Sequence, residues 1–434
     1  SWATAVNGTV QGISVGDLDG DGVLEVATVV RTTTDQRIVV HDAAGTLRWS
    51  VVSATPIAGF PTFADFDGDG ADEIGYCELS TTGRCIVLDG NGTQLWASGP
   101  YYYPGMSMGG PAAASINANP GVDMVVMSWG GYVALLDGAT GTQDWYYDAW
   151  TVHNELFHGH AAIGDLDNNG TLEIVVGGAY HGTVIALDAA TGAEVWFNND
   201  LAEIAGTFKG SGVALADLDG AQGTLEVIFA VEATVPRLMA LESNGLVRWT
   251  TDVDEILTWR TPVVADIDGD GLPEAILQSG DGTIRVYSNA GVQRSITELG
   301  DTSWMSGVAL ADVNGDYKPE IIAATRHKVF VLDSNLTVLA QLDVAGSGLN
   351  ASACVADLDG AGPGTGMILL GGYTSQKVHA LSLGTAINYQ WTTLAGSSRH
   401  TAFLATTAPP PVGASGETSS TSTSADQGDM VLGY

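Results

Sequence analysis

The chain has 434 residues and a net charge of −35, because 50 acidic side chains stand against only 15 basic ones. So few bases cannot neutralise the phosphates of a nucleic acid, and nucleic-acid binding is therefore excluded. No apolar run reaches the ~20 residues that a membrane-spanning helix needs, so no membrane span is expected. The acidity fits either the acidic coat of a halophilic protein or a set of cation sites. We favour cation sites, because many of the acids fall in one recurring loop.

That loop has the pattern D-x-D-x-D-G-x-x-E and recurs about every fifty residues, which is the signature of a repeat architecture. A stretch of small and apolar residues precedes each loop, and a β-branched run follows it. A second apolar run, a turn with Gly and often a Trp complete the repeat. Each repeat therefore predicts four short strands, and no stretch has a convincing helical period. The loops begin at Asp17, Asp65, Ser115, Asp165, Asp217, Asp266, Asp312 and Asp357.

Four antiparallel strands in each repeat are the unit of a propeller blade. We predict an all-β protein over residues 1–406, a β-propeller of eight four-stranded blades. The segment Ser1–Val6 has the pattern of an outer, Trp-bearing strand, so it could complete the last blade and close the ring. Two further strands are predicted at 389–391 and 399–406, which is more than one closed ring needs. Seven blades with an added module therefore remain the alternative.

The C-terminal segment, residues 407–434, has a different composition, rich in Ser, Thr, Pro and Gly. Linkers and stalks have such a composition. Its last residues, Asp429–Tyr434, could add a strand to a sheet edge of the same subunit or of a neighbour. We therefore predict self-association, as a homo-oligomer or filament, through this tail.

The first loop, DLDGDGVLE, shows why the pattern indicates a metal. Asp17, Asp19 and Asp21 alternate with residues that include two glycines, which allow a tight curl. The carbonyl of Val23 and the carboxylate of Glu25 can then close a shell of oxygens, which suits calcium better than magnesium. Asx-turns without a metal are the alternative. An EF-hand is excluded, because its closing acid is the twelfth residue and not the ninth.

The loops differ in completeness. Those at Asp17, Asp65, Asp266 and Asp312 are complete, and Asn169 replaces the third acid in the loop at Asp165. The loop at Asp217 contains an extra residue, so its binding is doubtful, and those at 115 and 357 are degenerate. The candidate calcium ligands are Asp17, Asp19, Asp21, Val23, Glu25, Asp65, Asp67, Asp69, Ala71, Glu73, Asp165, Asp167, Asn169, Thr171, Glu173, Asp217, Asp219, Glu226, Asp266, Asp268, Asp270, Leu272, Glu274, Asp312, Asn314, Asp316, Lys318 and Glu320.

With these residues in view, the pattern resembles the FG-GAP, or VCBS-type, repeat of integrin α-subunit propellers and of secreted bacterial proteins. The resemblance covers about residues 10–395. It implies that each loop joins the first two strands of a blade and holds one calcium ion. Separately, LDGATGTQDW (136–145) and LDAATGAEVW (187–196) resemble the tryptophan-docking turns of quinoprotein-type propellers. That second resemblance implies architecture only.

Two features favour secretion. The chain begins at Ser1 with neither a Met nor a signal peptide, as a processed N-terminus does. Cys77 and Cys85 flank a turn, and they lie within disulfide reach if the hairpin is symmetric about that turn. Two unpaired thiols are the alternative. Cys354 lies in an apolar run and is expected to be a buried, inert thiol.

The face opposite the calcium loops carries the blade connections and a second set of candidates. Aromatic and basic side chains gather there, in a chain with few bases, and could bind a glycan, although they could equally cap strand ends. The chain contains no catalytic motif in a suitable context. We therefore expect a secreted, calcium-stabilised structural or adhesive protein, with a lectin or a rhamnogalacturonan-type polysaccharide lyase as alternatives. The candidate ligand-face residues are His158, His160, Lys209, Trp259, Arg260 and Trp304.

Overall fold

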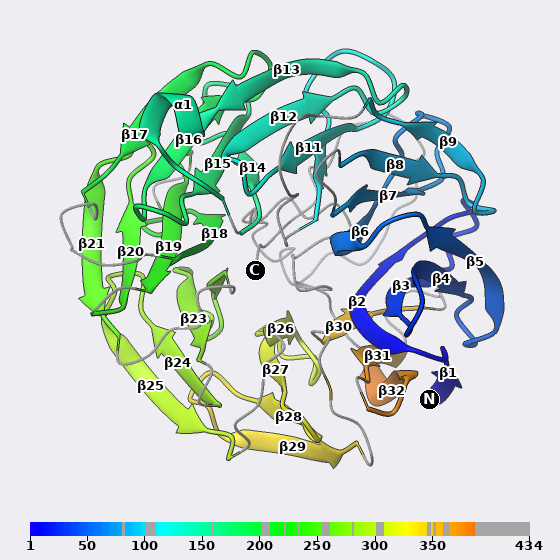
Figure 1. Cartoon of the computed structure of the whole chain (residues 1–434). Helices are drawn as coiled ribbons and strands as arrows, with labels where there is room; N and C mark the ends of the chain where they lie inside the picture. The colour runs from blue at the N-terminus through cyan, green and yellow to red at the C-terminus, as the bar shows by residue number, and fades with distance from the viewer. Residues whose placement is uncertain are drawn as a thin grey trace, which may run out of the picture.

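The computed structural model describes residues 1–79, 83–99, 110–157, 159–200, 209–220, 223–232, 235–253, 261–279, 282–300, 308–344, 349, 353–358, 365–372 and 374–386. These residues form β1 to β32, which are arranged as eight antiparallel sheets of four strands each. The sheets stand around a common axis as the blades of a propeller (Figure 1). The predicted all-β propeller with eight blades is confirmed, and the alternative count of seven is wrong.

The first four blades follow one another along the chain, each running from its innermost strand to its outermost. Blade 1 comprises β2 (Thr9–Gly16), β3 (Glu25–Arg31), β4 (Gln36–His41) and β5 (Leu47–Ser53). Blade 2 comprises β6 (Ile57–Ala64), β7 (Glu73–Glu78), β8 (Cys85–Leu88) and β9 (Gln94–Ala97). Blade 3 comprises β10 (Ala112–Ala114), β11 (Asp123–Met127), β12 (Tyr132–Leu136) and β13 (Gln143–Asp148). Blade 4 comprises β14 (Ala162–Gly164), β15 (Glu173–Gly177), β16 (Val184–Asp188) and β17 (Glu194–Asn198).

The other four blades repeat this order, except that the last one borrows a strand. Blade 5 comprises β18 (Lys209–Ala216), β19 (Glu226–Glu232), β20 (Arg237–Leu241) and β21 (Val247–Asp252). Blade 6 comprises β22 (Val263–Ala265), β23 (Glu274–Gln278), β24 (Thr283–Tyr287) and β25 (Gln293–Glu298). Blade 7 comprises β26 (Val308–Ala311), β27 (Glu320–Ala324), β28 (Lys328–Leu332) and β29 (Val338–Asp343). Blade 8 comprises β30 (Cys354–Ala356), β31 (Thr365–Gly371), β32 (Lys377–Ala386) and β1 (Trp2–Ala5).

Ring closure depends on the borrowed strand. β1 pairs antiparallel with β32, with Trp2 opposite Ala380, so the first strand of the chain is the outermost strand of the last blade (Figure 1). This is the clasp that the pattern of Ser1–Val6 predicts. The predicted strands at 389–391 and 399–406, the boundary at 406 and the tail 407–434 lie outside the described residues.

The burial pattern explains why these sequences form blades. Short inner strands carry small residues and are buried throughout, as in the Ala-Ala-Ala of β10, because the strands converge at the axis. Second and third strands are almost wholly buried between neighbouring blades, and their β-branched residues suit that setting. Outer strands alternate between partly buried and exposed residues at the rim, as in β25. The hydrophobic core is therefore a series of clusters between adjacent blades.

Tryptophans connect neighbouring blades at six successive contacts around the ring. In each, the indole Nε1 of an outer-strand Trp donates to a backbone carbonyl in the turn between the third and fourth strands of the next blade, at 2.6–2.9 Å. The ring lies against a turn glycine that has a positive φ. At Gly141, for example, φ is +68°, and a Cβ would lie 2.3 Å from Cε3 of Trp96. The donors and acceptors are Trp2 and Ala43, Trp49 and Gly90, Trp96 and Gly138, Trp145 and Ala189, Trp196 and Ser243, and Trp249 and Asn289.

One short helix, α1 (Ala149–His153), lies between β13 and β14 and was not predicted. Its N-cap is Asp148, whose carboxylate accepts a hydrogen bond from the N–H of Thr151 at 2.9 Å. Five residues are too few to display a helical period in the sequence. In the described part of the chain, no helix has the length and apolar character required to cross a membrane.

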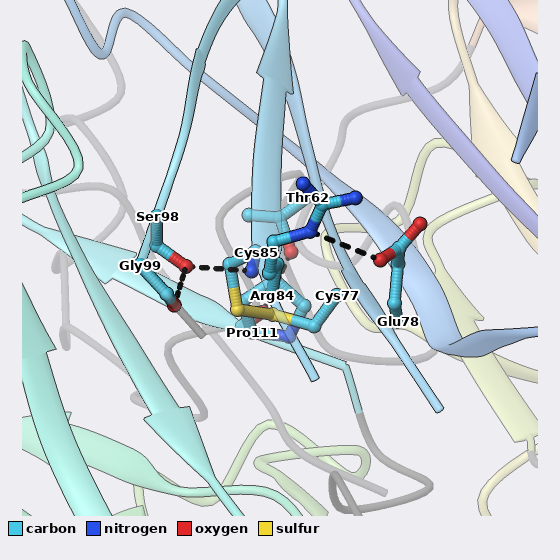
Figure 2. The surroundings of a disulfide bond; sticks show 8 residues. All are labelled: Thr62, Cys77, Glu78, Arg84, Cys85, Ser98, Gly99 and Pro111. Carbon is cyan, nitrogen blue, oxygen red and sulfur yellow. Dashed lines mark hydrogen bonds and ion pairs between the residues drawn. A yellow bond between two sulfur atoms is a disulfide. The ribbon is translucent and has the colours of Figure 1, made fainter. Parts of the chain in front are cut away.

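A disulfide joins Cys77 of β7 to Cys85 of β8, and the two Cα atoms lie 4.0 Å apart (Figure 2). The two residues are directly opposite in the strand register. On one side of the disulfide, the Ser98 hydroxyl accepts a hydrogen bond from the N–H of Cys85 at 2.9 Å. Cys354 is a buried cysteine outside the disulfide, and burial raises the pKa of its thiol above the usual range.

Candidate metal centres

The loop between β2 and β3 curls around the carboxylate of Asp17. Its two oxygens accept hydrogen bonds from the N–H groups of Gly20 at 2.8 Å, Asp21 at 3.1 Å and Gly22 at 2.8 Å. Gly20 and Gly22 have φ values of +70° and +84°, a region that L side chains rarely adopt. The alternation of Asp and Gly in the sequence is therefore what the curl requires.

The same geometry recurs in the other acidic loops, which all join the first and second strands of a blade and so lie on one face of the ring. In the loops at Asp65, Asp266 and Asp312, the first acid likewise accepts hydrogen bonds from the N–H groups of the fourth, fifth and sixth loop residues. The residues at the fourth and sixth loop positions have positive φ. They are Gly20, Gly22, Gly68, Gly70, Asn168, Gly170, Gly269, Gly271, Gly315 and Tyr317.

The closing Glu of each loop is buried and divides its two oxygens between two tasks. In the first loop, Oε2 of Glu25 accepts a hydrogen bond from the N–H of Leu18 at 2.9 Å, and Oε1 pairs with Arg48 at 2.5 Å. The equivalent bond forms in the other loops, and these Glu side chains are at most 4% exposed. The Glu residues are Glu25, Glu73, Glu173, Glu226, Glu274 and Glu320.

Burial makes the charged form of these Glu residues costly when no metal is bound. Desolvation, together with the neighbouring Asp67 and Asp65 carboxylates, raises the pKa of Glu73 to about 8. Desolvation likewise raises the pKa of Glu226, Glu274 and Glu320 to about 7. A cation at the loop would offset this cost by pairing with the carboxylates.

The first acid, the second acid and the closing Glu converge in five of the loops. In each group, one carboxylate oxygen from every residue lies within 4.8 Å of the others. Such a set of oxygen donors fits a hard divalent cation like calcium, so these clusters could hold a metal ion. The groups are Asp17, Asp19 and Glu25; Asp65, Asp67 and Glu73; Asp165, Asp167 and Glu173; Asp217, Asp219 and Glu226; and Asp266, Asp268 and Glu274.

The third acid, or Asn169 in its place, lies outside these groups and supports the curl in five of the loops. Asp21 accepts a hydrogen bond from the N–H of Val23 at 2.8 Å. The same bond, at 2.8–2.9 Å, is donated by the N–H groups of Ala71, Thr171, Leu272 and Lys318. The residues predicted to offer a carbonyl ligand therefore lie in a turn that is closed by the side chain two residues earlier. The acceptors in these loops are Asp69, Asn169, Asp270 and Asp316.

Two loops depart from the sequence pattern, and only one of them keeps the cluster. In the loop at Asp217, the extra residue does not prevent the three acids from converging. In the loop at Asp312, the second position is Asn314, whose amide donates to Glu320 Oε1 at 2.5 Å, so an amide takes the place of one carboxylate. Asn314 still offers a carbonyl oxygen, but that oxygen accepts a hydrogen bond from the N–H of Asp316 at 2.9 Å.

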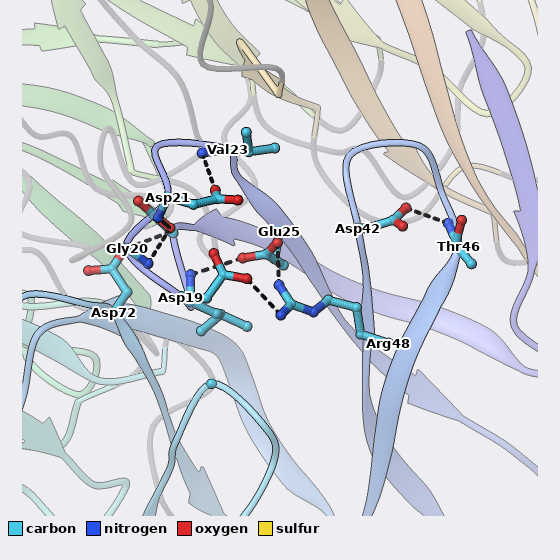
Figure 3. Close-up of polar contacts among 12 residues, drawn as sticks. Asp19, Gly20, Asp21, Val23, Glu25, Asp42, Thr46, Arg48 and Asp72 are labelled. Carbon is cyan, nitrogen blue, oxygen red and sulfur yellow. Dashed lines mark hydrogen bonds and ion pairs between the residues drawn. The ribbon is translucent and has the colours of Figure 1, made fainter.

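Three arginines, which the sequence analysis did not select, reach into the acidic clusters from the outer strands. Arg48 pairs with Asp19 at 2.8 Å and with Glu25 at 2.5 Å (Figure 3). Arg294 pairs with Asp268 at 2.5 Å and with Glu274 at 2.6 Å. In blade 5, Arg248 pairs with Asp219 at 3.1 Å and lies 3.8 Å from Glu226. In blade 1 the guanidinium borders an open hollow of about 400 Å³, which also contains Asp19, Asp21, Glu25 and Asp42.

The predicted ligand face is only partly described. His160 is 4% exposed, so in this structure it is a buried residue and not a surface contact. His158, Trp259, Arg260, Trp304 and the side chain of Lys209 lie outside the described residues. The described part of this face contains Glu155, which is fully buried and accepts hydrogen bonds from the N–H of Tyr180 at 2.6 Å and from the Thr183 hydroxyl at 2.8 Å. Glu155 therefore fixes a blade connection.

Comparison with known proteins agrees with this architecture. Residues 266–323, which include the loops of blades 6 and 7, match the model of the FG-GAP-like repeat family. The molecule is an eight-bladed β-propeller with acidic loops between its first and second strands. At residues 266–323 its repeats are of the FG-GAP type. No curated protein matches the chain significantly.

Several solved propellers share the fold at low sequence identity. The rhamnogalacturonan lyase PL11 of Bacillus licheniformis is 19% identical, with a TM-score of 0.61 over 87% of this chain and 72% of that chain. The exotype rhamnogalacturonan lyase YesX is 17% identical, with the same TM-score of 0.61 and coverage of 87% and 72%. BamB of Moraxella catarrhalis is 16% identical, with a TM-score of 0.53 over 88% of this chain and 97% of that chain. At such identities the similarity shows the fold alone.

Proposed function

We propose that this chain is an extracellular, calcium-stabilised propeller with a structural or adhesive role. The observation that carries the calcium part is the convergence of three carboxylate oxygens within 4.8 Å in five loops. Carboxylates at such distances repel one another, and burial adds a cost for each Glu. A bound cation relieves both, and it does so only in the folded ring, because the curled loop does not exist in the unfolded chain.

Thermal unfolding with and without calcium tests this part. Each occupied site should stabilise the fold by RT ln(1 + [Ca]/Kd), so five sites should together raise the melting temperature markedly. Excess EDTA should lower the melting temperature, added calcium should restore it, and magnesium at the same concentration should restore less. An Asp65→Asn variant should lose part of the response. A melting temperature that EDTA leaves unchanged would refute calcium stabilisation.

Two observations support an extracellular location. The buried disulfide between Cys77 and Cys85 suits an oxidising compartment. FG-GAP repeats are also commonly extracellular, and residues 266–323 match that family. Fractionating the native host and comparing the mass of the secreted chain before and after reduction would test both points. Recovery of the chain only from cytosol, with two free thiols, would contradict the location.

The structural or adhesive role rests on the absence of a catalytic motif from the sequence and on the composition of residues 407–434. We propose that this tail associates with a neighbouring subunit by adding a strand to an exposed sheet edge. Such head-to-tail exchange produces open assemblies. Electron microscopy and sedimentation of the full chain in millimolar calcium should then show oligomers or filaments. Dispersed monomers at high protein concentration would contradict self-association.

The alternative of a polysaccharide lyase is favoured by one observation, the fold shared with two rhamnogalacturonan lyases. Fold similarity does not carry an activity with it. Incubating the protein with rhamnogalacturonan in calcium and following ultraviolet absorbance would reveal the unsaturated products of a lyase. Product formation would replace the structural role, and a glycan array would detect lectin binding without turnover.

A further inference from the structure

A β-bulge interrupts the pairing between the third and fourth strands of a blade, one residue before the tryptophan position of the fourth strand. In blade 1, Val40 pairs with Trp49 and His41 pairs with Leu47, so Arg48 has no partner in the register. The same shift occurs in blades 2 to 7 of the described chain. A bulge re-aims the side chain of the extra residue. These bulge residues are Arg48, Leu95, Asp144, Val195, Arg248, Arg294 and Leu339.

In four blades the bulge residue contacts the side chain at the second acid position of the loop in the same blade. Arg48 contacts Asp19, Arg248 contacts Asp219 at 3.1 Å, and Arg294 contacts Asp268. In blade 3 the bulge residue is an acid, Asp144, and it accepts a hydrogen bond from Asn117, the third residue of that degenerate loop, at 3.3 Å. An arginine and an aspartate therefore make the same contact. The backbone at the bulge, and not charge attraction alone, thus directs the bulge side chain toward the loop.

Where the bulge residue is Arg, it also approaches the closing Glu. The guanidinium of Arg48 lies 2.5 Å from Glu25, that of Arg294 lies 2.6 Å from Glu274, and that of Arg248 lies 3.8 Å from Glu226. The guanidinium thus bridges two of the three converging carboxylates. A divalent cation would have to displace this guanidinium or bind beside it.

Blades 2 and 4 lack this charge. Their bulge residues are Leu95 and Val195, which are 42% and 52% exposed. Their loops carry the same converging acids, at Asp65 and Asp165, and in the described part of the chain these acids form no ion pair. Each of the two loops therefore contains three converging carboxylates that no described basic side chain neutralises.

We propose that the bulge residue decides which cation neutralises its loop. In blades 1, 5 and 6 the arginine is a built-in cation that keeps the loop folded without metal and weakens calcium binding. The loops of blades 2 and 4 are the tight calcium sites, on which the metal-dependent stability of the ring rests. The ranking of sites rests on the proposed calcium binding and adds to it the residue that sets the affinity of each loop.

Exchanging the bulge residues between blades tests the ranking. Arg48→Leu should lower the melting temperature in EDTA and leave it nearly unchanged in calcium, while tightening calcium binding at one site roughly tenfold, because a repelling charge has been removed. Leu95→Arg should do the reverse, raising the melting temperature in EDTA and removing one tight site. Calorimetric titration of the full chain with calcium gives the number and affinity of the sites.

Each exchange has a matched control. Arg37→Leu removes an arginine of the same blade that pairs with Asp35 and not with the loop, and Val52→Arg adds a charge to an exposed position of β5. Both controls should leave the calcium affinities unchanged. Equal loss of stability with and without calcium in Arg48→Leu, or an unchanged number of tight sites in Leu95→Arg, would overturn the ranking alone. Absence of calcium binding from every variant would overturn both the ranking and the proposed calcium stabilisation.

Discussion

At six successive contacts, from blade 8 round to blade 6, an outer-strand Trp lies on the turn of the next blade, whereas at the contact of blades 6 and 7 both partners are different. The Trp position in β25 is Ser295, which pairs with Val286 as Trp49 pairs with Val40. The glycine position in the next turn is Leu336, which has a φ of +63° and is 5% exposed.

Both partners of this contact change together, which shows that the space between the blades must be filled but that a tryptophan is not required to fill it. Where a ring is present, a glycine makes room for it; where the ring is missing, Leu336 fills the contact from the other side. Leu336 belongs to a buried cluster that also includes Tyr287 and Leu299 of the preceding blade. In blade 7 this packing offsets the cost of holding Leu336 in the left-handed backbone region.

The contact of blades 7 and 8 differs for a topological reason. The Trp position in β29 is Ala340. The outermost strand of blade 8 is β1, which comes from the other end of the chain, so no turn joins it to β32 and no turn carbonyl is available to a docking Trp. Ring closure by the first strand and loss of the docking Trp at this contact are therefore two consequences of one arrangement.

The largest effect is expected inside the docked part of the ring. Trp96 is 8% exposed and donates to Gly138 of blade 3, so Trp96→Ala should lose packing and this bond, at a cost of about 3–5 kcal/mol in the free energy of unfolding. Trp150→Ala, at a position 45% exposed on α1, should cost less than about 1 kcal/mol. Equal costs in denaturant unfolding would show that docking does not hold the blades together.

The paired exchange can be transplanted at the contact of blades 6 and 7. Ser295→Trp alone should overpack against Leu336 and cost about 1–3 kcal/mol. Leu336→Gly alone should leave a cavity and cost about 2 kcal/mol or more, since relief of its φ offsets part of the loss. The double variant should recover at least about 1 kcal/mol in a double-mutant cycle. Additive costs would mean that the two positions do not share one space.

A smaller effect separates backbone strain from the ring contact. Gly141→Ala places a Cβ 2.3 Å from Trp96 at a φ of +68° and should cost about 2 kcal/mol or more. Gly300→Ala, at a φ of +72° with no described atom within 4 Å, should cost only the strain, about 1 kcal/mol. If both substitutions cost the same, the turn glycines are needed for their φ and not for the tryptophan.

The sequence predicts most of the fold, because the acidic loop needs Asp and Gly at fixed spacing and so reveals each blade. It also predicts the clasp, through the outer-strand pattern of Ser1–Val6. The bulge arginines could not be found in this way, since a bulge depends on strand register, although an Arg before a Trp at 48 and 248 is a visible signal. The Ser295 and Leu336 exchange is equally hidden, because each residue is ordinary alone.

The smallest effect concerns the loop of blade 7. Tyr317 has a φ of +68° at a position where the loops of blades 1, 2, 4 and 6 have Gly22, Gly70, Gly170 and Gly271, and a Cβ at those glycines would meet nothing within 4 Å. The ring of Tyr317 is 60% exposed, so the residue is tolerated sterically but its backbone is strained. Tyr317→Gly should relieve the strain and stabilise the protein by about 0.5–1 kcal/mol, after the entropy that a glycine loses on folding. Tyr317→Ala removes the ring and keeps the strain, so it should leave the melting temperature unchanged. Equal gains from both variants would assign the effect to the exposed ring and not to the backbone.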